Sequence, residues 1–211
     1  MGKKVFITGA GGFIGANLVR ALLARGDETH VLSRPESSFW RLDEIKEKLI
    51  FHSAQIYDKD AVLGVVESIQ PEQVFHLAHF GGNAGENDLG LVHKVIIEGT
   101  NALFEACGKV NSVKSVVSLG SSSEYGVKQS AMKENMLLEP NTPYGCAKAW
   151  ATLYGQHLAR ERNIPITILR PFSVFGPWES LPRFMPSVIL SCLRRAAPKV
   201  TNPLLVRDFI F

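Results

Sequence analysis

Tyr144 and Lys148 are the first residues whose spacing suggests chemistry, because they stand four apart in the stretch TPYGCAK, residues 142–148. The preceding Thr142 and Pro143 are typical of a helix start, as N-cap and first helical residue, so the tyrosine and the lysine should share one helix face. A free tyrosine titrates at about pH 10, and a nearby ammonium lowers that value because it stabilises the phenolate. Such a pair can accept or return a hydroxyl proton. Taken alone, the spacing also fits an ordinary solvated helix face.

A glycine-rich stretch, ITGAGGFIGANL, follows the first predicted strand at once and opens the first predicted helix. Gly9, Gly12 and Gly15 give the spacing G-x-x-G-x-x-G. Glycine permits a turn with positive φ and lets the backbone approach a diphosphate closely, while the helix N-terminus offers free N–H groups. The alternative is an ordinary glycine-rich turn, but the strand-turn-helix context favours dinucleotide binding.

The end of the second predicted strand bears on which dinucleotide binds. NAD-binding folds usually place an acidic residue there for the ribose hydroxyls, whereas this strand ends in Ser33 followed by Arg34. A guanidinium can bind a 2′-phosphate through two hydrogen bonds, so the sequence slightly favours NADP over NAD. The alternative is that Arg34 is a solvated loop residue and that Glu36 or Asp27 serves the ribose.

Strand and helix patterns alternate along the whole chain. Short, nearly continuous apolar runs rich in β-branched residues are typical of strands buried on both faces, and they lie at 4–8, 29–32, 49–52, 73–78, 114–119 and 164–170. Helical patterns lie between them, at 13–25, 58–69, 91–108 and 143–163. The alternation predicts an α/β fold with a doubly wound parallel sheet, a Rossmann fold of six or seven strands. Such a sheet is covered on both faces and binds ligands beyond the carboxyl ends of its strands.

Composition narrows the function classes. The 211 residues, 45% of them hydrophobic, suffice for one large core. The net charge of +3 comes without a basic block, which argues against nucleic acid as a partner. The cysteines are far apart and no Cys/His spacing suits zinc, so we expect no metal site. No stretch is long and apolar enough to cross a membrane and no leader precedes the first strand, so we expect a soluble, cytoplasmic protein.

With these motifs in place, the chain resembles the extended short-chain dehydrogenase/reductase superfamily, in particular its nucleotide-sugar branch, the NAD-dependent epimerase/dehydratase family. The matching stretches run in family order along essentially the whole chain. They are TGAGGFIG (8–15), HLA (76–78), EGTNAL (98–103), GSSSEYG (120–126), YGCAK (144–148), RPFSVFGP (170–177) and RDFIF (207–211).

The resemblance implies roles for individual residues. The hydroxyl residue four before the tyrosine of YG completes the catalytic set, which then consists of Ser121, Tyr144 and Lys148. A slip of one residue along the run of serines would move the role of Ser121 to Ser122. Expected substrate contacts come from Ser122, Ser173 and Arg183. Expected cofactor contacts come from Gly9, Gly12, Phe13, Ile14, Gly15, Ser33, Arg34, Leu77, Ala78, Tyr144, Lys148, Pro171 and Val174.

The resemblance also implies a reaction. In the family, hydride moves between C4 of a sugar and the nicotinamide while the tyrosine handles the proton on O4. We therefore expect an NAD(P)-dependent oxidoreductase or isomerase that acts on a nucleotide sugar, by 4-keto reduction or 4-epimerisation. Family dehydratases add an Asp-Glu pair after the hydroxyl residue, where this chain has Ser122 and Ser123, with Glu124 one position late unless a local deletion returns it to that role. Two alternatives are a non-catalytic or truncated NADP(H)-binding relative and an NADPH-dependent reductase of a small carbonyl compound.

The end of the chain departs from the family pattern. In the family, RDFI leads into an aspartate-rich segment and further residues that complete the sugar-nucleotide site, whereas this sequence stops at Phe211. We therefore expect a fragment or a natural short form, in which residues 1–180 form the dinucleotide-binding domain and 181–211 begin an incomplete substrate-binding lobe. Family dimers often form through helices that include the Tyr-Lys helix, so a homodimer is a candidate assembly.

Overall fold

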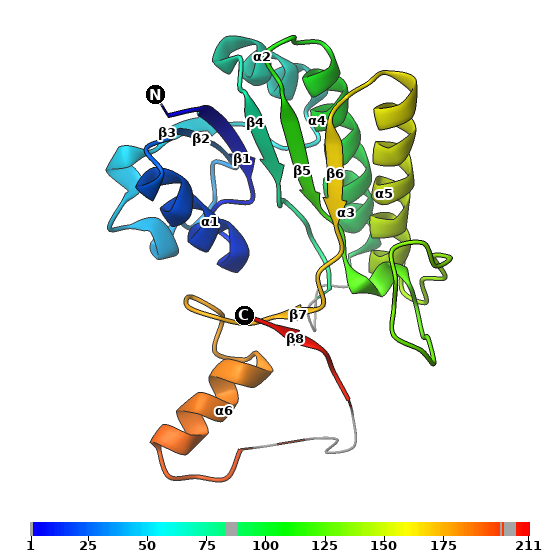
Figure 1. Cartoon of the computed structure of the whole chain (residues 1–211). Coiled ribbons are helices and arrows are strands. Elements are labelled where there is room, and N and C mark those ends of the chain that lie inside the picture. The colour runs from blue at the N-terminus through cyan, green and yellow to red at the C-terminus, as the bar shows by residue number, and fades with distance from the viewer. Residues whose placement is uncertain (1, 83–87, 199, 201–205) are drawn as a thin grey trace.

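In the computed structural model, which describes residues 2–82, 88–198, 200 and 206–211, six strands form one sheet in the order β3-β2-β1-β4-β5-β6 (Figure 1). All neighbouring strands of this sheet run parallel. The strands are β1 Lys4–Thr8, β2 Glu28–Ser33, β3 Ile50–Ser53, β4 Gln73–His76, β5 Ser115–Leu119 and β6 Ile166–Leu169. The order reverses direction between β1 and β4, and a doubly wound sheet binds ligands beyond the carboxyl ends at this point. The predicted fold class is confirmed.

Helices connect these strands close to the predicted ranges. The longer connecting helices are α1 Phe13–Ala24, α2 Lys59–Ile69, α4 Gly99–Gly108 and α5 Pro143–Glu161. A further helix, α6 Phe184–Leu193, follows the six strands in a region where no helical pattern was predicted. The region predicted as one helix before β5 begins with α3 Leu89–Val92 and a π-helical stretch, η3 His93–Glu98, that leads into α4. Short 3-10 turns are η1 Trp40–Leu42, η2 Lys46–Lys48 and η4 Ser122–Glu124. Within the ranges described, none of the helices has the length and apolar character needed to cross a membrane.

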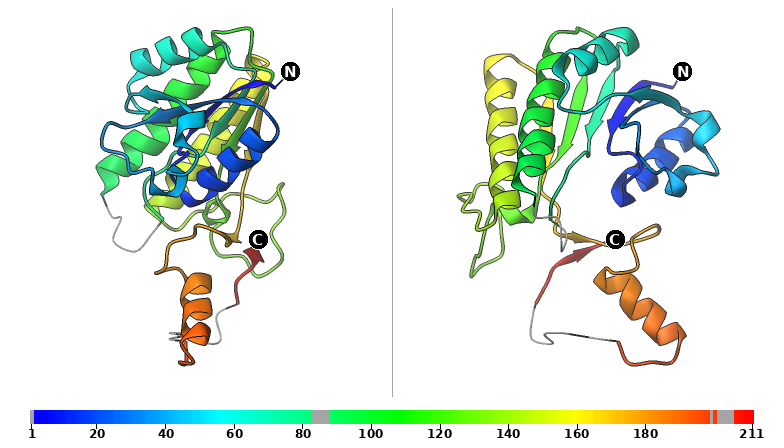
Figure 2. Two further views of the ribbon diagram at one scale, coloured as in Figure 1. Left: turned by 90° about the vertical axis from the view of Figure 1, so that its left-hand side faces the viewer. Right: turned by 180° about the vertical axis from the view of Figure 1, so that it is seen from behind.

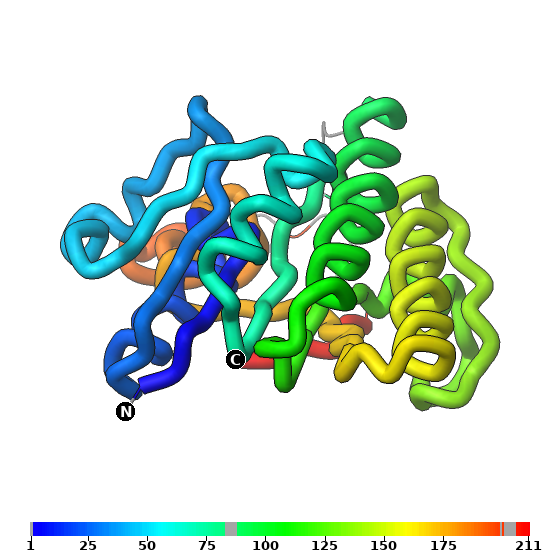
Figure 3. The backbone as a smooth tube through the Cα atoms, turned by 90° about the horizontal axis from the view of Figure 1, so that it is seen from above, coloured from blue at the N-terminus to red at the C-terminus, as the bar shows by residue number. Residues whose placement is uncertain are grey.

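Apolar side chains pack on both faces of the sheet, but the cover is unequal. Figures 2 and 3 show α2, α4 and α5 in a row on one face and α1 on the other. Side chains such as Phe6, Val74 and Val116 pack against the row, whereas Val5 and Ile7 pack against α1. On β6, Thr167 and Leu169 point to the α1 side and are exposed, Leu169 by 49%. The expectation of a sheet covered on both faces therefore fails at this edge.

A smaller second sheet lies beyond the carboxyl ends of the main sheet in Figure 1. It pairs β7, Ser173–Val174, in parallel with β8, Phe209–Ile210. The Phe209 ring stacks on Phe184 of α6 at 5.9 Å between centroids. Since β7 precedes residue 180 and pairs with the last strand, this small layer crosses the predicted domain boundary. The division into 1–180 and 181–211 stays a prediction.

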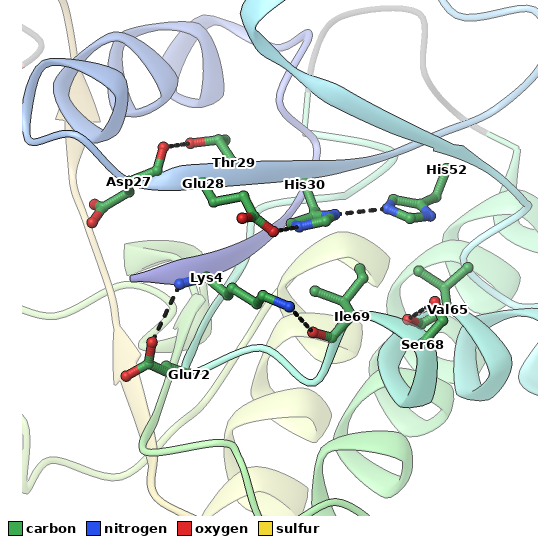
Figure 4. A network of polar contacts seen from close by, with 10 residues as sticks. All are labelled: Lys4, Asp27, Glu28, Thr29, His30, His52, Val65, Ser68, Ile69 and Glu72. Atoms are coloured by element: carbon green, nitrogen blue, oxygen red, sulfur yellow. Dashed lines mark hydrogen bonds and ion pairs between the residues drawn. The ribbon is translucent and has the colours of Figure 1, made fainter. Parts of the chain in front are cut away.

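A network of polar contacts joins the first three strands, away from the carboxyl-end loops (Figure 4). The His30 ring lies between Glu28, 2.8 Å from its Nε2, and His52, 2.9 Å from its Nδ1. Lys4 Nζ donates to the carbonyl of Ile69, which ties β1 to the end of α2. These polar groups are satisfied by one another, and they hold the sheet rather than face a ligand.

Candidate active site

The helix that carries Tyr144 and Lys148 begins as predicted. Thr142 is the N-cap of α5, and its Oγ1 accepts a hydrogen bond from the N–H of Gly145 at 3.0 Å. Pro143 occupies the first turn, where its missing N–H costs nothing. A Cβ added to Gly145 would lie 2.6 Å from the carbonyl oxygen of Ser123. The glycine therefore lets the start of α5 approach the serine turn closely.

Lys148 is buried between the end of β5 and Tyr144. Its ammonium donates to the carbonyl oxygen of Leu119 at 2.7 Å and lies 6.0 Å from the centroid of the Tyr144 ring. Burial lowers the pKa of Lys148 to about 8, and the negative charge of Glu124 opposes that shift. A buried ammonium this close to the phenol favours the charged phenolate form of the ring.

Tyr144 is half-buried beside the loop that follows β4. A Cβ on Gly82 would lie 3.2 Å from Tyr144 Cζ, and one on Gly81 would lie 3.3 Å from Cδ2. Both glycines have positive φ, of 86° and 93°. The ring of His79 meets the Tyr144 ring edge-on at 6.4 Å. The loop after β4 thus shapes the space around the phenol, a role that the sequence reasoning did not assign to these glycines.

Ser121 follows β5 and caps the short turn η4. Its Oγ accepts from the N–H of Ser123 at 3.1 Å, which leaves the hydroxyl hydrogen available to a substrate oxygen. Ser122 is tied by its backbone N–H to the carbonyl of Pro171 at 3.0 Å. Both serines are half-buried in this turn, so the assignment of the catalytic hydroxyl to Ser121 stays a prediction.

Glu124, one position late for the acid of the family dehydratases, is fully buried. It is 0% exposed, and its two carboxylate oxygens accept from the N–H of Ser121 and the hydroxyl of Thr152, both at 2.7 Å. Ser121 and Glu124 form a capping box. The S-x-x-E spacing of that motif is visible in the sequence, and the sequence reasoning missed it.

The glycine loop forms a close-fitting turn between β1 and α1. Gly9 has φ +77°, and a Cβ there would lie 2.6 Å from the backbone nitrogen of Ala78. A Cβ on Gly15 would lie 2.2 Å from the carbonyl oxygen of Gly9. Gly12 is the N-cap of α1 and offers no side-chain cap. The N–H groups of the first turn, at Phe13, Ile14 and Gly15, have no acceptor within the helix, as at every helix N-terminus, and such groups can bind an anion.

A chain of buried polar contacts connects the end of β1 to the end of β4 and to α4, next to the glycine loop. The Ala78 N–H donates to Thr8 Oγ1 at 3.2 Å, and Thr8 Oγ1 lies 2.7 Å from His76 Nδ1. His76 Nε2 lies 3.0 Å from Thr100 Oγ1 on α4. Each threonine hydroxyl can donate or accept, so both ring nitrogens of a neutral His76 have a partner in either tautomer. Burial, together with Lys148 and His79, lowers the pKa of His76 to about 3.

The Tyr-Lys helix, the serine turn and the glycine loop all lie within the part of the chain that matches one family. The profile of the NAD dependent epimerase/dehydratase family matches residues 5–211. The chain belongs to this family. The resemblance inferred from the motifs is thereby confirmed.

The similar proteins have names that refer to different activities. Sterol demethylase protein B of Methylococcus capsulatus is 30% identical over 188 residues, which cover 87% of this chain and 55% of the relative. An uncharacterised UDP-glucose epimerase of Bacillus subtilis is 30% identical over 187 residues, which cover 82% of this chain and 57% of the relative. Among solved structures, UDP-glucuronic acid 4-epimerase from Bacillus cereus, in complex with UDP-glucuronic acid and NAD, is 27% identical with a TM-score of 0.82 over 98% of this chain and 68% of that chain. The chain thus spans little more than half the length of these curated relatives.

The other predicted contact residues of this epimerase/dehydratase family member lie at the end of β2, in β7 and just before α6. Ser33 ends β2, and Arg34 lies 3.6 Å from Glu36, with both side chains more than half exposed. Val174 lies in β7, and the N–H of Ser173 donates to the carbonyl of Asp208 at 3.1 Å. Arg183 is exposed before the first turn of α6, with Nε 3.4 Å from Glu179. No cluster of three or more His, Cys, Asp or Glu suited to a metal occurs in the described ranges.

Arg41, in the turn η1, contacts the glycine loop, and the sequence reasoning missed it. Its Nη1 donates to the carbonyl of Gly11 at 3.2 Å, its Nε to the carbonyl of Trp178 at 2.8 Å, and its Nη2 to Ser180 Oγ at 2.9 Å. Arg20 stacks on the Trp178 ring at 4.3 Å. These contacts join the glycine loop to the segment that leads into α6, and no short motif in the sequence signals them.

Proposed function

We propose that the protein binds NAD at the carboxyl ends of β1 and β4 and transfers a proton to or from the O4 hydroxyl of a nucleotide sugar through Tyr144. The observation that carries the proposal is the position of Lys148, which is held by Leu119 at the end of β5 and faces the Tyr144 ring. An ordinary lysine keeps its ammonium in solvent, and burial of this group therefore indicates a specific role.

In this proposal each catalytic residue has one task. The Lys148 ammonium favours the phenolate of Tyr144, so that the phenol can take the substrate proton near neutral pH and return it. Ser121 donates its hydroxyl hydrogen to the same substrate oxygen and orients it. The glycines after β4 let that loop pass close to the Tyr144 ring and so fix one side of the phenol.

The proposed cofactor is NAD, and the glycine loop supports the choice of a dinucleotide. Gly9 and Gly15 leave no room for a Cβ, and the first turn of α1 presents its N–H groups to a diphosphate. When bound, NAD would supply hydride acceptor and donor chemistry at C4 of the sugar. The slight preference for NADP finds no support, because the family is NAD-dependent and Arg34 pairs with Glu36 at the surface.

The substrate proposal is a nucleotide sugar, with 4-epimerisation preferred to 4-keto reduction. It is supported by the relative named as a UDP-glucose epimerase and by the structural neighbour that holds UDP-glucuronic acid. An epimerase keeps its cofactor through the cycle, which agrees with NAD rather than an exchanging NADPH.

The test combines cofactor titration with turnover. Calorimetry with NAD and NADP should give tighter binding for NAD, and NMR of UDP-glucose or UDP-glucuronic acid incubated with protein and NAD should give the 4-epimer. Tyr144→Phe keeps the ring and removes the proton donor, so it should lower kcat by about 100-fold or more while NAD still binds. Full activity of Tyr144→Phe would refute the proton role. NAD binding without turnover of either sugar would favour the non-catalytic binder, and tight NADP binding alone would overturn the cofactor.

A further inference from the structure

Glu124 is a buried charged residue that the proposed proton transfer does not use. It is 0% exposed, whereas the serines beside it in η4 are half-buried. A Cβ on Gly120 would lie 2.3 Å from Glu124 Oε1. The glycine before Ser121 therefore leaves the space that this carboxylate fills. An ionisable group enters a protein interior only where something compensates for its lost hydration.

The first compensation is a pair of hydrogen bonds to two different elements. Oε1 accepts from the backbone N–H of Ser121 at 2.7 Å, and Oε2 accepts from the hydroxyl of Thr152 at 2.7 Å. Thr152 lies one helical turn after Lys148 on α5. The carboxylate thus connects the turn that carries the serine to the helix that carries the tyrosine and the lysine.

The second compensation is electrostatic, because Glu124 is held at the N–H of Ser121 and Lys148 at the carbonyl of Leu119, two residues apart at the end of β5. The ammonium of Lys148 donates to the carbonyl of Leu119, a group without net charge. Burial lowers the pKa of Lys148, and the charge of Glu124 raises it. Burial also raises the pKa of Glu124, while its two hydrogen bonds and the charges of Arg170 and Lys148 lower it. Among the described residues, Tyr144 on the same helix and His76 at the end of β4 are further ionisable groups near the lysine, and His79 lies in the loop after β4 beside Tyr144 and His76.

We propose that Glu124 is a positioning residue of the candidate active site: its carboxylate holds the Ser121 turn and supplies the counter-charge of the buried Lys148 ammonium. Its catalytic meaning rests on the proposed function, because an uncharged Lys148 would no longer favour the Tyr144 phenolate. The proposed effect of Glu124 on the charge of Lys148 needs no ligand, so it can be measured without any substrate.

The direct test is an NMR titration of the Lys148 side chain through its Cε resonance, assigned by its loss in Lys148→Met. The wild-type midpoint is expected at about 8. Glu124→Gln has nearly the same shape without the charge, and it should lower that midpoint by about one pH unit or more. An unchanged midpoint in Glu124→Gln would overturn the proposal.

Two control variants separate charge from contact. Thr152→Val removes one hydrogen bond to Glu124 and leaves the carboxylate in place, so the Lys148 midpoint should stay near the wild-type value. Glu105→Gln removes a carboxylate that is also hydrogen-bonded to α5, through Tyr154, and it should leave the midpoint unchanged. A shift in Glu105→Gln equal to that in Glu124→Gln would mean that no specific pairing exists.

A reverse titration decides the question if Glu124→Gln does not fold. The Glu124 carboxyl carbon is followed in the wild-type protein and in Lys148→Met. Two paired charges shift each other's protonation, so the loss of the ammonium should raise the Glu124 midpoint by about one pH unit. An equal midpoint in the two proteins would refute the pairing.

The catalytic consequence is read from a pH profile with NAD and UDP-glucose as probes. In Glu124→Gln the alkaline fall of kcat/KM should begin about one pH unit lower than in the wild type. A residue that only supports the fold would lower kcat/KM equally at every pH, and that result would overturn the electrostatic role. If the wild-type protein turns over neither sugar, the proposed function fails, and the two NMR titrations still decide the role of Glu124.

Discussion

At the residue scale, the candidate site depends on where single protons lie. Lys148 and His76 are both buried near the carboxyl ends of β4 and β5. The two groups differ in how the cost of burying an ionisable side chain is offset. Lys148 has a carboxylate nearby, whereas His76 lies between two threonine hydroxyls that satisfy its neutral ring. A protonated His76 would place a second buried positive charge near the Lys148 ammonium. The structure therefore requires this histidine to stay neutral.

This requirement predicts a pH dependence of stability. The His76 pKa falls from 6.5 to about 3 on folding. Between these two pH values, His76 is therefore protonated in the unfolded chain and neutral in the folded chain. The free energy of unfolding should therefore fall as pH falls below 6.5, with a slope of up to about 1.4 kcal/mol per pH unit from this group. Urea unfolding from pH 7 to pH 4 measures it.

The matched variant is His76→Asn, which cannot titrate in this range. Its stability should depend less steeply on pH than that of the wild type, whatever its stability at pH 7. Parallel pH curves for the two proteins would contradict the neutral, buried histidine, because other groups would then supply the whole slope.

At the element scale, the short turn between β1 and α1 is the tightest part of the site. Gly9 lies against the backbone of the loop after β4, and Gly15 in the first turn of α1 lies against Gly9. These contacts bring the helix N-terminus close to the strand ends. The glycines thus serve packing as well as the expected approach of a diphosphate.

Gly15→Ala tests this packing directly. The added Cβ would lie 2.2 Å from the Gly9 carbonyl oxygen, so the loop must move, and the free energy of unfolding should fall by about 1–3 kcal/mol. NAD binding should weaken at the same time. Gly64→Ala is the control, because Gly64 is an exposed helical glycine with nothing within 4 Å of its added Cβ. It should raise stability by about 0.5–1 kcal/mol. Equal effects at the two sites would refute the close contact.

At the scale of the whole molecule, Arg41 joins parts that lie far apart in the sequence. Its guanidinium donates to Gly11 in the glycine loop and to Trp178 and Ser180 before α6. The position of α6 therefore depends on the loop that we assign to the cofactor. The link therefore holds the glycine loop and the segment before α6 in fixed positions relative to each other.

Arg41→Gln should release the segment that leads into α6. The shorter, neutral side chain cannot span the three acceptors, so amide hydrogen exchange over residues 176–183 should become faster, while β4 and β5 keep their protection. Arg34→Gln is the control, because Arg34 is an exposed arginine paired with Glu36, and it should leave exchange in 176–183 unchanged. Equal exchange in Arg41→Gln and the wild type would contradict the link.

The sequence by itself determined the six strands of the main sheet, the helices that connect them, the fold class and the family, but neither α6 nor the β7–β8 pair. Apolar runs and helical periods located the six strands and the helix starts, because burial on both faces and helix capping leave local patterns. The glycine spacing, the serine run and the Tyr-Lys spacing pointed to one site, since parallel strands bring their carboxyl ends to the same edge.

Only the tertiary structure decided how these residues meet. The burial of Lys148, the neutral state of His76 and the inward carboxylate of Glu124 depend on contacts between segments that are distant in sequence, which no local pattern encodes. The link made by Arg41 and the bare face of β6 are equally non-local. Protonation follows from burial and neighbouring charge, and both exist only once the chain has folded.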